Sequence, residues 1–488
     1  MKLHLAASVV LCLCGLSLSQ PRHGRLNHES PVVQYRQQQQ REVAVDKFNF
    51  IDLELLELAA QNDAGNIVLS PVSVKTALSM LWEGADGSTA DEIGAALRLT
   101  GRSRELQENK LHQYQKDLMF VKKTLKKGEL VPSSTLELAS QVFVSDKLAL
   151  NPKYQEALAH YRATAQSVNM SDTMQSAAAV NKWVNMATHG LVPSLVEESS
   201  LSEETVMVLA NAVYFQGKWQ TAFDPDSTSS GTCFYPDTGE CLKVQMMETM
   251  GTFKSKLVHE LDATLLEMPY DDGRYSMLIL LPERRDGMPQ LMRNLLFGNL
   301  LQVLSKDDME ESDYVVLLPK FTIDYEADLV PFLQKLHVKD VFTPSANLTR
   351  MVKQDMAKLL EPAVSNVFHK AKIVVDERGA VAAGTSGALV VPLMGGPQPK
   401  FKADHPFLFF IRDSKTSSFL FAGRVSRPDE APAVPAAPAA ANESVPAAAS
   451  PSASEPAVPL VSMRVQEMKP APDAEQANIK FPSNSKQE

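Results

Sequence analysis

The pattern of apolar and polar positions predicts helices early in the chain and strands late in it. Apolar residues recur at three- and four-residue spacing in residues 47–61, as an amphipathic helix requires: Phe48, Ile51, Leu55 and Leu58. A second helix opens at Ser70 and Pro71, and its apolar positions continue to Leu81. Later segments predict strands, several of them apolar on both faces and therefore buried: 277–281, 314–318, 372–375, 406–411 and 419–421. This order is typical of an α+β fold and not of a regular βαβ repeat.

Residues 379–399 carry no charged side chain and allow two interpretations. At the period of a strand every second residue is small, so one face would consist of tiny groups: Ala380, Ala382, Gly384, Ser386 and Ala388. Such a strand can slide between two others over a packed core without clashing. The glycines and prolines of the same segment also suit an exposed loop. The residues alone leave open whether this is a plain surface loop or a loop that becomes a buried strand.

The two ends of the chain differ in composition from its body. Residues 1–19 combine a short positive start, an apolar stretch at 5–16 and small residues at 17 and 19, which predicts a signal peptide and a secreted, extracellular protein. Residues 20–44 are polar and predict a flexible arm. Residues 428–488 are rich in alanine and proline and predict a disordered tail. The body between them, residues 45–427, shows no obvious linker.

Composition and charge exclude some classes of protein. The chain has 44% hydrophobic and 22% charged residues, as a soluble globular protein does. Its formal net charge of -10 argues against a nucleic-acid partner, because phosphate binding needs a basic surface. No apolar stretch long enough for a membrane span follows the signal peptide, so no membrane partner is expected.

Cysteines and glycosylation sequons fit a secreted protein. Cys12 and Cys14 lie in the signal peptide, whereas Cys233 and Cys241 flank a turn sequence at 236–239. Two strands joined by that turn would bring the two sulfurs together, and the oxidising exterior would favour a disulfide worth about 2–3 kcal/mol. Two unpaired thiols are the alternative. Acceptor asparagines for glycosylation stand at Asn169, Asn347 and Asn442.

Seven blocks along the body resemble the serpin family, in the family's order. They are residues 66–73 (Asn-Ile-Val-Leu-Ser-Pro-Val-Ser), 84–92, 181–190, 211–219, 318–321 (Leu-Pro-Lys-Phe), 401–407 and 421–425. The resemblance implies one serpin domain at 45–427, with a large central sheet, two smaller sheets, about nine helices and an exposed reactive loop. It also implies an inhibitor that catalyses no reaction and uses no cofactor or metal.

The resemblance assigns a mechanism to the uncharged segment. A serine protease attacks the loop and forms an acyl-enzyme, and the cut loop then enters the central sheet and carries the covalently bound protease with it. The hinge of the loop would be formed by Glu377, Gly379, Ala380, Ala382, Ala383 and Gly384. By the same resemblance, a polar cluster beneath the middle of the sheet permits its opening by exchanging hydrogen bonds: Ser70, Ser73, Asn211 and His369. Trp219 resembles the aromatic residue at the point where insertion begins.

Two places depart from the family pattern. Ala380 and Val381 stand where a small hydroxyl residue and an acid are usual. Ala380 is small enough to be buried and Val381 would face outward, so insertion is still expected. His337 stands where the family often has glycine, and the sequence offers no account of that change.

The resemblance also indicates the target. Counting from Glu377 as the first hinge residue, the family's usual register places the reactive bond between Leu393 and Met394. A leucine suits the apolar specificity pocket of chymotrypsin-like or elastase-like proteases, and the absence of Arg and Lys from 379–399 disfavours trypsin-like ones. A slipped register would instead place Val391 or Met394 at the bond.

The sequence leaves two further questions open, one about a second binding site and one about the type of serpin. Lysines in a predicted helix region suggest a site for a polyanion such as a glycosaminoglycan, or simply a solvated helix end: Lys116, Lys122, Lys123, Lys126 and Lys127. The protein could also be a non-inhibitory serpin that acts as a carrier, storage or binding protein. The small hinge residues favour the inhibitor, which we expect to act as a monomer in a covalent complex with an extracellular serine protease.

Overall fold

The computed structural model describes residues 51–99, 103–118, 134–237, 239–295, 309–353, 362–378 and 398–431. They belong to one compact unit, Met1–Pro432, and a second unit, Ala433–Glu488, lies outside the described residues. The predicted signal peptide, the polar arm, the loop segment 379–397 and nearly all of the Ala/Pro-rich tail also lie outside them.

The described ranges contain eight α-helices and five short 3₁₀ helices. The α-helices are α2 (Ile51–Asn62), α3 (Pro71–Gly84), α4 (Gly87–Ala96), α5 (Arg104–Leu118), α6 (Pro152–Leu158), α7 (Thr173–Ala187), α8 (Met288–Asn294) and α10 (Val330–Lys335). The 3₁₀ helices are η1 (Ala159–Tyr161), η2 (Glu198–Ser200), η3 (Pro225–Ser227), η4 (His259–Leu261) and η6 (Asp340–Phe342). Helix α3 begins as predicted, with Ser70 as the N-cap and Pro71 in the first turn.

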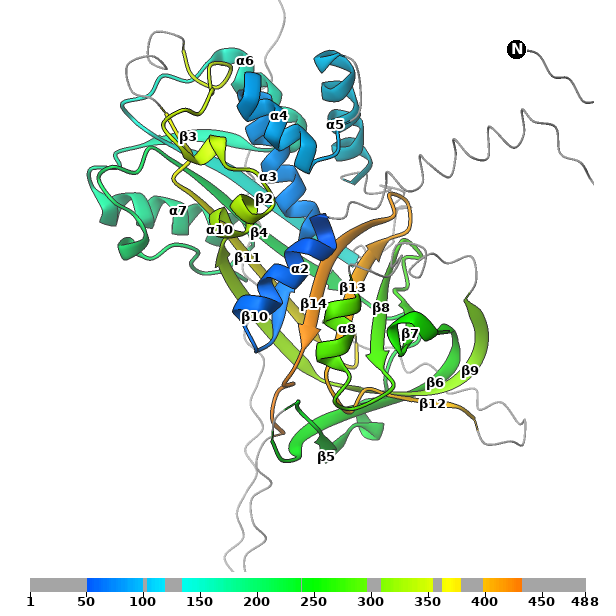
Figure 1. The fold of residues 1–488 in the computed structure, drawn as a ribbon. Helices are drawn as coiled ribbons and strands as arrows, with labels where there is room; N and C mark the ends of the chain where they lie inside the picture. Colours follow the sequence, from blue (N-terminus) through cyan, green and yellow to red (C-terminus); the bar gives the residue numbers. More distant parts are fainter. Residues whose placement is uncertain are drawn as a thin grey trace, which may run out of the picture. The chain divides into compact units, whose positions relative to one another are not determined.

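Five strands form the sheet that carries the candidate site. Their order is β10 (Phe321–Asp328), β11 (Asn366–Val375), β4 (Met207–Gly217), β2 (Ser134–Ser145) and β3 (Thr164–Val168). Strands β4 and β11 are parallel neighbours, although about 150 residues of chain separate them, and they lie side by side in Figure 1. A parallel pair needs a long crossover connection, which the intervening strands and helices supply.

The remaining strands form one nine-stranded sheet. They are β1 (Ile67–Leu69), β5 (Ser229–Phe234), β6 (Leu242–Val258), β7 (Ala263–Pro269), β8 (Tyr275–Pro282), β9 (Glu310–Pro319), β12 (Lys400–Lys402), β13 (Phe407–Asp413) and β14 (Ser418–Val425). The resemblance implies two smaller sheets, and here they are continuous because the 17-residue strand β6 pairs with β7 at one end and with β5 and β9 along its length. The predicted strands coincide with β8, β9, β11, β13 and β14, apart from residue 406, which precedes β13, and this confirms those predictions. The α+β fold is likewise confirmed.

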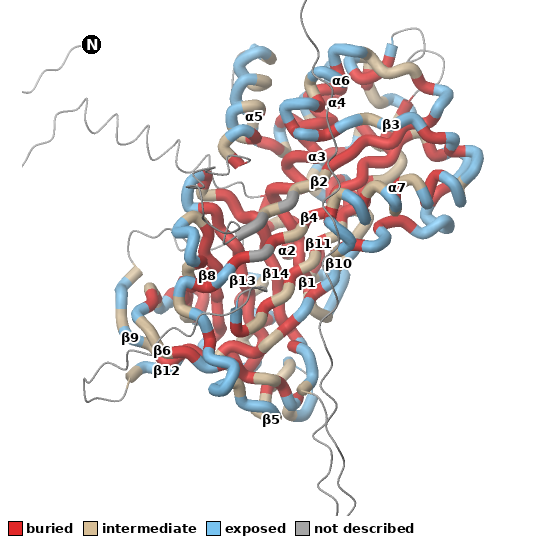
Figure 2. Tube along the Cα trace, turned by 180° about the vertical axis from the view of Figure 1, so that it is seen from behind, coloured by how far each residue is buried: buried red, intermediate tan, exposed pale blue. Residues whose placement is uncertain are grey.

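Both faces of the five-stranded sheet are covered. Met207 and Leu209 of β4 belong to the hydrophobic cluster that contains α3, whereas Val208 and Ala210 belong to the cluster that contains α7. Because side chains alternate between the faces of a strand, α3 and α7 pack on opposite faces. Figure 2 shows the resulting gradient, with buried strands at the centre and exposed residues on the outer side of α5 and α7. All 14 residues of α3 are buried, so this helix is the centre of the core.

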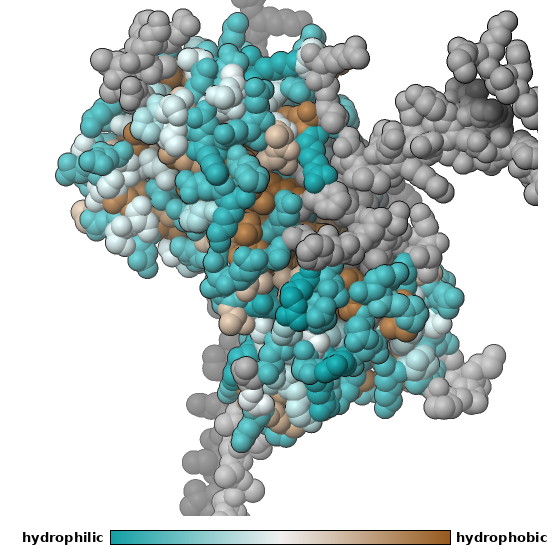
Figure 3. Space-filling view, in the orientation of Figure 1, coloured by the Kyte–Doolittle hydropathy of each residue, from teal (hydrophilic) through white to brown (hydrophobic). Residues whose placement is uncertain are grey.

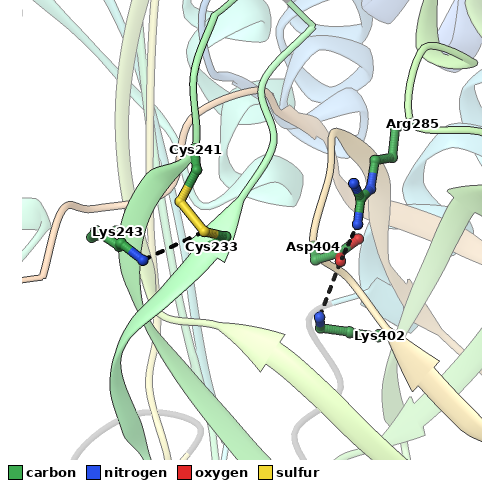
Figure 4. The surroundings of a disulfide bond; sticks show 6 residues. All are labelled: Cys233, Cys241, Lys243, Arg285, Lys402 and Asp404. Atoms are coloured by element: carbon green, nitrogen blue, oxygen red, sulfur yellow. Dashed lines mark hydrogen bonds and ion pairs between the residues drawn. A yellow bond between two sulfur atoms is a disulfide. The ribbon is translucent and has the colours of Figure 1, made fainter.

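The predicted disulfide is present. Cys233 at the end of β5 is bonded to Cys241 just before β6, with their Cα atoms 5.1 Å apart (Figure 4). The bond closes the hairpin as the turn sequence predicts. The face of the molecule seen in Figure 3 is largely hydrophilic. Among the described residues, none of the helices combines the length and the apolarity that a bilayer crossing would need.

Candidate functional site

Four buried polar residues meet beneath the pair β4 and β11. The backbone N–H of Ser70 donates to Nε2 of His369 at 3.1 Å, and Asn211 Nδ2 donates to the Ser73 carbonyl and to Ser140 Oγ, each at 3.0 Å. The Ser73 hydroxyl also donates to Asn211 Oδ1. Sequence resemblance therefore groups these four residues correctly in space. Each is nearly or completely shielded from solvent, so these hydrogen bonds offset the cost of burying polar groups.

His369 is neutral in this environment. Complete burial lowers its pKa from 6.5 to about 4. Since Nε2 accepts the hydrogen bond from Ser70, the ring proton resides on Nδ1, which has no hydrogen-bond partner among the described residues. Protonation of His369 would remove the acceptor for the N–H of Ser70, which is the N-cap of α3.

The pairing of β4 with β11 stops before the strands do. The pairs run from Val208 and Asn366 to Tyr214 and Lys372, whereas β4 continues to Gly217 and β11 to Val375. The described part of the sheet is thus less tightly joined at the end from which the chain leaves β11 toward the loop.

Trp219 lies beyond that end and not within the polar cluster. Its indole N–H donates to the carbonyl of Asp376 at 3.1 Å, and its backbone N–H donates to the carbonyl of Arg378 at 3.3 Å. The ring stacks on Tyr270, with centroids 4.5 Å apart. Trp219 therefore contacts the residues on either side of Glu377, at the start of the predicted hinge, which is where the resemblance places it.

Glu377 is the part of the hinge that the structure describes, and it is firmly anchored. Its carboxylate pairs with Lys320 Nζ at 2.5 Å and accepts from Thr228 Oγ1 at 2.9 Å, and its carbonyl accepts from the N–H of Phe223 at 3.0 Å. Burial alone would raise the pKa of Glu377, but hydrogen bonds from Lys320, its own backbone and Thr228 outweigh burial and lower it. Sequence reasoning missed Lys320, although it stands in the Leu-Pro-Lys-Phe block at 318–321.

The chain after the loop is anchored on the disulfide-closed hairpin. The backbone N–H of Tyr235 donates to the carbonyl of Asp404 at 2.8 Å. The Asp404 carboxylate also binds Arg285 at 3.4 Å and Lys402 at 3.2 Å, as Figure 4 shows. Burial would raise the pKa of Asp404, but hydrogen bonds from His405 and Lys402 lower it to about 2. Both ends of the loop segment are therefore fixed to the body.

Several predicted site residues lie outside the described residues and stay predictions. They are the hinge residues Gly379, Ala380, Ala382, Ala383 and Gly384, the reactive bond Leu393–Met394, the lysines Lys122, Lys123, Lys126 and Lys127, and the sequon Asn442. Lys116 is exposed near the end of α5. Asn169 is exposed, whereas Asn347 is half-buried and accepts from the hydroxyl of Thr349 at 2.7 Å.

The structure accounts for the family's glycine at position 337. His337 follows the last turn of α10 with a φ of 65°, in the left-handed region that glycine adopts without strain. Its backbone N–H donates to the carbonyl of Gln334 at 3.2 Å. The position terminates the helix, and histidine fills it here at some conformational cost.

Known proteins resemble most of the chain. The family model described as Serpin (serine protease inhibitor) matches residues 49–428, so the chain belongs to the serpin family. Serine protease inhibitor 42Dd of Drosophila melanogaster is 33% identical over 377 residues, which cover 77% of this chain and 95% of that protein. Leukocyte elastase inhibitor of Bos taurus is 31% identical over 384 residues, covering 78% and 97%. The structure of Serpin48 from the insect Tenebrio molitor has a TM-score of 0.66 and 28% identity, covering 79% and 97%.

Proposed function

We propose that the protein is a secreted, monomeric inhibitor of chymotrypsin-like or elastase-like serine proteases that acts by inserting its cut loop between β4 and β11. The observation that carries the proposal is the geometry of this pair. The two strands are parallel, their pairing ends early, and only residues 376–378 separate the end of β11 from residues 379–397. A segment that folds back from the end of β11 runs antiparallel to both strands.

Insertion is favourable because it replaces one parallel ladder with two antiparallel ones. Antiparallel pairing is slightly more stable per residue than parallel pairing. Roughly ten additional strand hydrogen bonds, at about 0.5–1.5 kcal/mol each, stabilise the inserted state on the order of 10 kcal/mol. The predicted small face of the loop, with Ala380 and Ala382 as its first members, fits this position over the core.

Insertion has to follow cleavage, because the loop is tied to the body at both ends. Glu377 is held by Lys320 and Thr228 at one end, and Asp404 is held by Tyr235 at the other. Attack of the protease serine on the carbonyl of Leu393 forms the acyl bond and releases the amine of Met394. The acylated half of the loop is then free to enter the sheet. Dragging the protease along displaces its catalytic groups, and misplacement by about 1 Å can cost 100-fold in rate.

The target class rests on the uncharged loop and is supported by the names of relatives. The trypsin-type pocket carries a carboxylate that selects basic residues, and residues 379–399 offer none. One relative, 31% identical, is named leukocyte elastase inhibitor. An uncharged leucine at position 393 fits an apolar pocket.

The test is incubation of the full chain with chymotrypsin, elastase and trypsin. We expect a complex with chymotrypsin or elastase that survives a denaturing gel. We also expect a released fragment whose mass corresponds to a peptide that begins at Met394. The Leu393→Arg variant should transfer complex formation to trypsin, and Ala380→Arg should be cleaved without a complex. Cleavage of the parent protein by every protease without a stable complex would favour a carrier, storage or binding protein instead.

A further inference from the structure

The disulfide between Cys233 and Cys241 is accessible to a reactant from solvent. Both cysteines are only half-buried, and the two residues that lead into Cys241, Gly239 and Glu240, are exposed. Exposed disulfides are the ones that external thiols attack, because exchange requires access to a sulfur atom. The bond therefore combines a structural position, at the turn end of the β5–β6 hairpin, with access for a thiol.

A cation contacts one of the two sulfur atoms. The Nζ atom of Lys243 lies 3.5 Å from Sγ of Cys233, and Figure 4 shows the lysine side chain directed at that sulfur. An ammonium group stabilises a neighbouring thiolate, and exchange is faster when the departing thiolate is the more stable one. The contact therefore favours Cys233 as the sulfur that leaves and Cys241 as the sulfur that is attacked.

The hairpin that the disulfide closes also holds two other parts of the chain. Tyr235 lies inside the covalent ring and donates its backbone N–H to the carbonyl of Asp404 at 2.8 Å, beyond the loop segment 379–397. The guanidinium of Arg285 lies 3.6 Å from the centre of the Tyr235 ring and binds the Asp404 carboxylate at 3.4 Å. The carbonyl of Lys243 accepts from the N–H of Ala431 at 2.8 Å, at the start of the predicted tail. A change in the ring is therefore felt by both segments.

The pairing of β5 with β6 does not require the disulfide. Five register pairs join the two strands, and the last of them, Phe234 with Leu242, is buried. Opening of the bond therefore leaves the strands together and frees only the connection between them, which contains Tyr235. The reduced protein is folded and locally loosened, because regions of a structure can open without global unfolding.

We propose that the Cys233–Cys241 bond is a site of thiol–disulfide exchange with a small monothiol, and that its opening loosens the hold of Tyr235 on Asp404. The thiolate of the monothiol attacks Sγ of Cys241 and forms a new S–S bond there. The Cys233–Cys241 bond breaks, and its electron pair leaves with Cys233 as a thiolate beside Lys243. A second monothiol attacks the external sulfur of the mixed disulfide and releases Cys241. The protein disulfide is thereby reduced, and two monothiols are oxidised to one disulfide. This reactivity goes beyond the inhibitory function.

The test is incubation of the full chain with reduced glutathione, followed by alkylation of free thiols and tandem mass spectrometry of the peptides, which distinguishes Cys233 and Cys241 from Cys12 and Cys14. In early samples we expect glutathione on Cys241 and the alkyl group on Cys233. The same chain unfolded in urea gives the rate of an unprotected bond, and we expect the folded chain to react no more than about tenfold more slowly. A larger slowing, or early glutathione on Cys233, would overturn the proposal.

Matched lysine variants test the assigned direction of the exchange. Lys243→Met removes the ammonium group but keeps the carbonyl that binds Ala431, and it should slow the exchange about threefold or more. Lys182→Met removes an exposed lysine from α7 and should leave the rate unchanged. Equal rates in the parent protein and Lys243→Met, or equal slowing by both variants, would contradict the role of Lys243 and with it the proposal.

Hydrogen exchange tests the consequence of opening the bond. The amide of Tyr235 and the amides of residues 400–404 should exchange faster in the reduced and alkylated chain than in the oxidised chain, whereas β13 should keep its exchange rate. Unchanged exchange at Tyr235 and at residues 400–404, or an equal increase in β13, would refute the local loosening. None of these readouts requires that the protein inhibits a protease, so their failure is distinguishable from failure of the proposed function.

Discussion

Acidification should weaken the fold through His369, and the size of the effect follows from its burial. The folded-state pKa of His369 is about 4, below the ordinary value of 6.5. As the pH falls between these values, the unfolded chain binds a proton that the folded chain rejects, so the free energy of unfolding decreases. The loss attributable to His369 between pH 7.5 and pH 5 is about 2 kcal/mol, and it approaches about 3 kcal/mol near pH 4.

The matched variant is His369→Gln, which cannot gain a proton in this range but places an acceptor near the position of Nε2. Urea unfolding of both proteins, followed by tryptophan fluorescence and circular dichroism, gives the free energy of unfolding at pH 7.5 and pH 5. Other groups titrate equally in both proteins, so the difference between the two pH effects isolates His369. A parent protein that loses no more stability than His369→Gln would refute the buried, neutral histidine.

Three further changes test other contacts. Lys320→Met leaves the shielded carboxylate of Glu377 without its cation, and we expect a loss of about 1–3 kcal/mol in urea unfolding; equal stability would show that the ion pair is not formed in solution. His337→Gly relieves a left-handed backbone and should raise the free energy of unfolding by about 1 kcal/mol, seen as a higher melting temperature. Replacing Cys233 and Cys241 together by serine should cost about 2–3 kcal/mol, with trypsin susceptibility at Lys402 as a second readout.

Local signals in the sequence were sufficient for individual elements. The cap Ser70 and Pro71 determine the start of α3, and the short turn between Cys233 and Cys241 places the two sulfurs together, because both depend on residues close in the chain. The apolar segments predicted β8, β13 and β14 because these strands are buried along their whole length.

Contacts between residues that are distant in the chain could not be predicted from such local patterns. Nothing local indicates that β4 and β11 are neighbours, and the resemblance to serpins, not periodicity, grouped Asn211 with His369. The ion pair between Lys320 and Glu377 joins residues 57 positions apart, so the sequence around either residue does not indicate it. The continuity of the nine-stranded sheet likewise depends on how β6 runs past three partners, which a pattern of apolar residues does not reveal.

The polar cluster lies where the proposed insertion would require the sheet to open. Asn211 and His369 are register partners on β4 and β11, but their hydrogen bonds lead down to α3: Asn211 binds Ser73 and His369 binds the backbone of Ser70. Both partner groups, the N–H of Ser70 and the carbonyl of Ser73, lie at the first turn of one helix. Separation of the strands therefore stretches the cluster across that turn, and at least one bond must break or the helix must turn. Each such bond contributes only about 1 kcal/mol net, far less than the stabilisation on the order of 10 kcal/mol proposed for the inserted loop. The cluster would therefore slow the opening of the sheet without changing which of the two states is more stable.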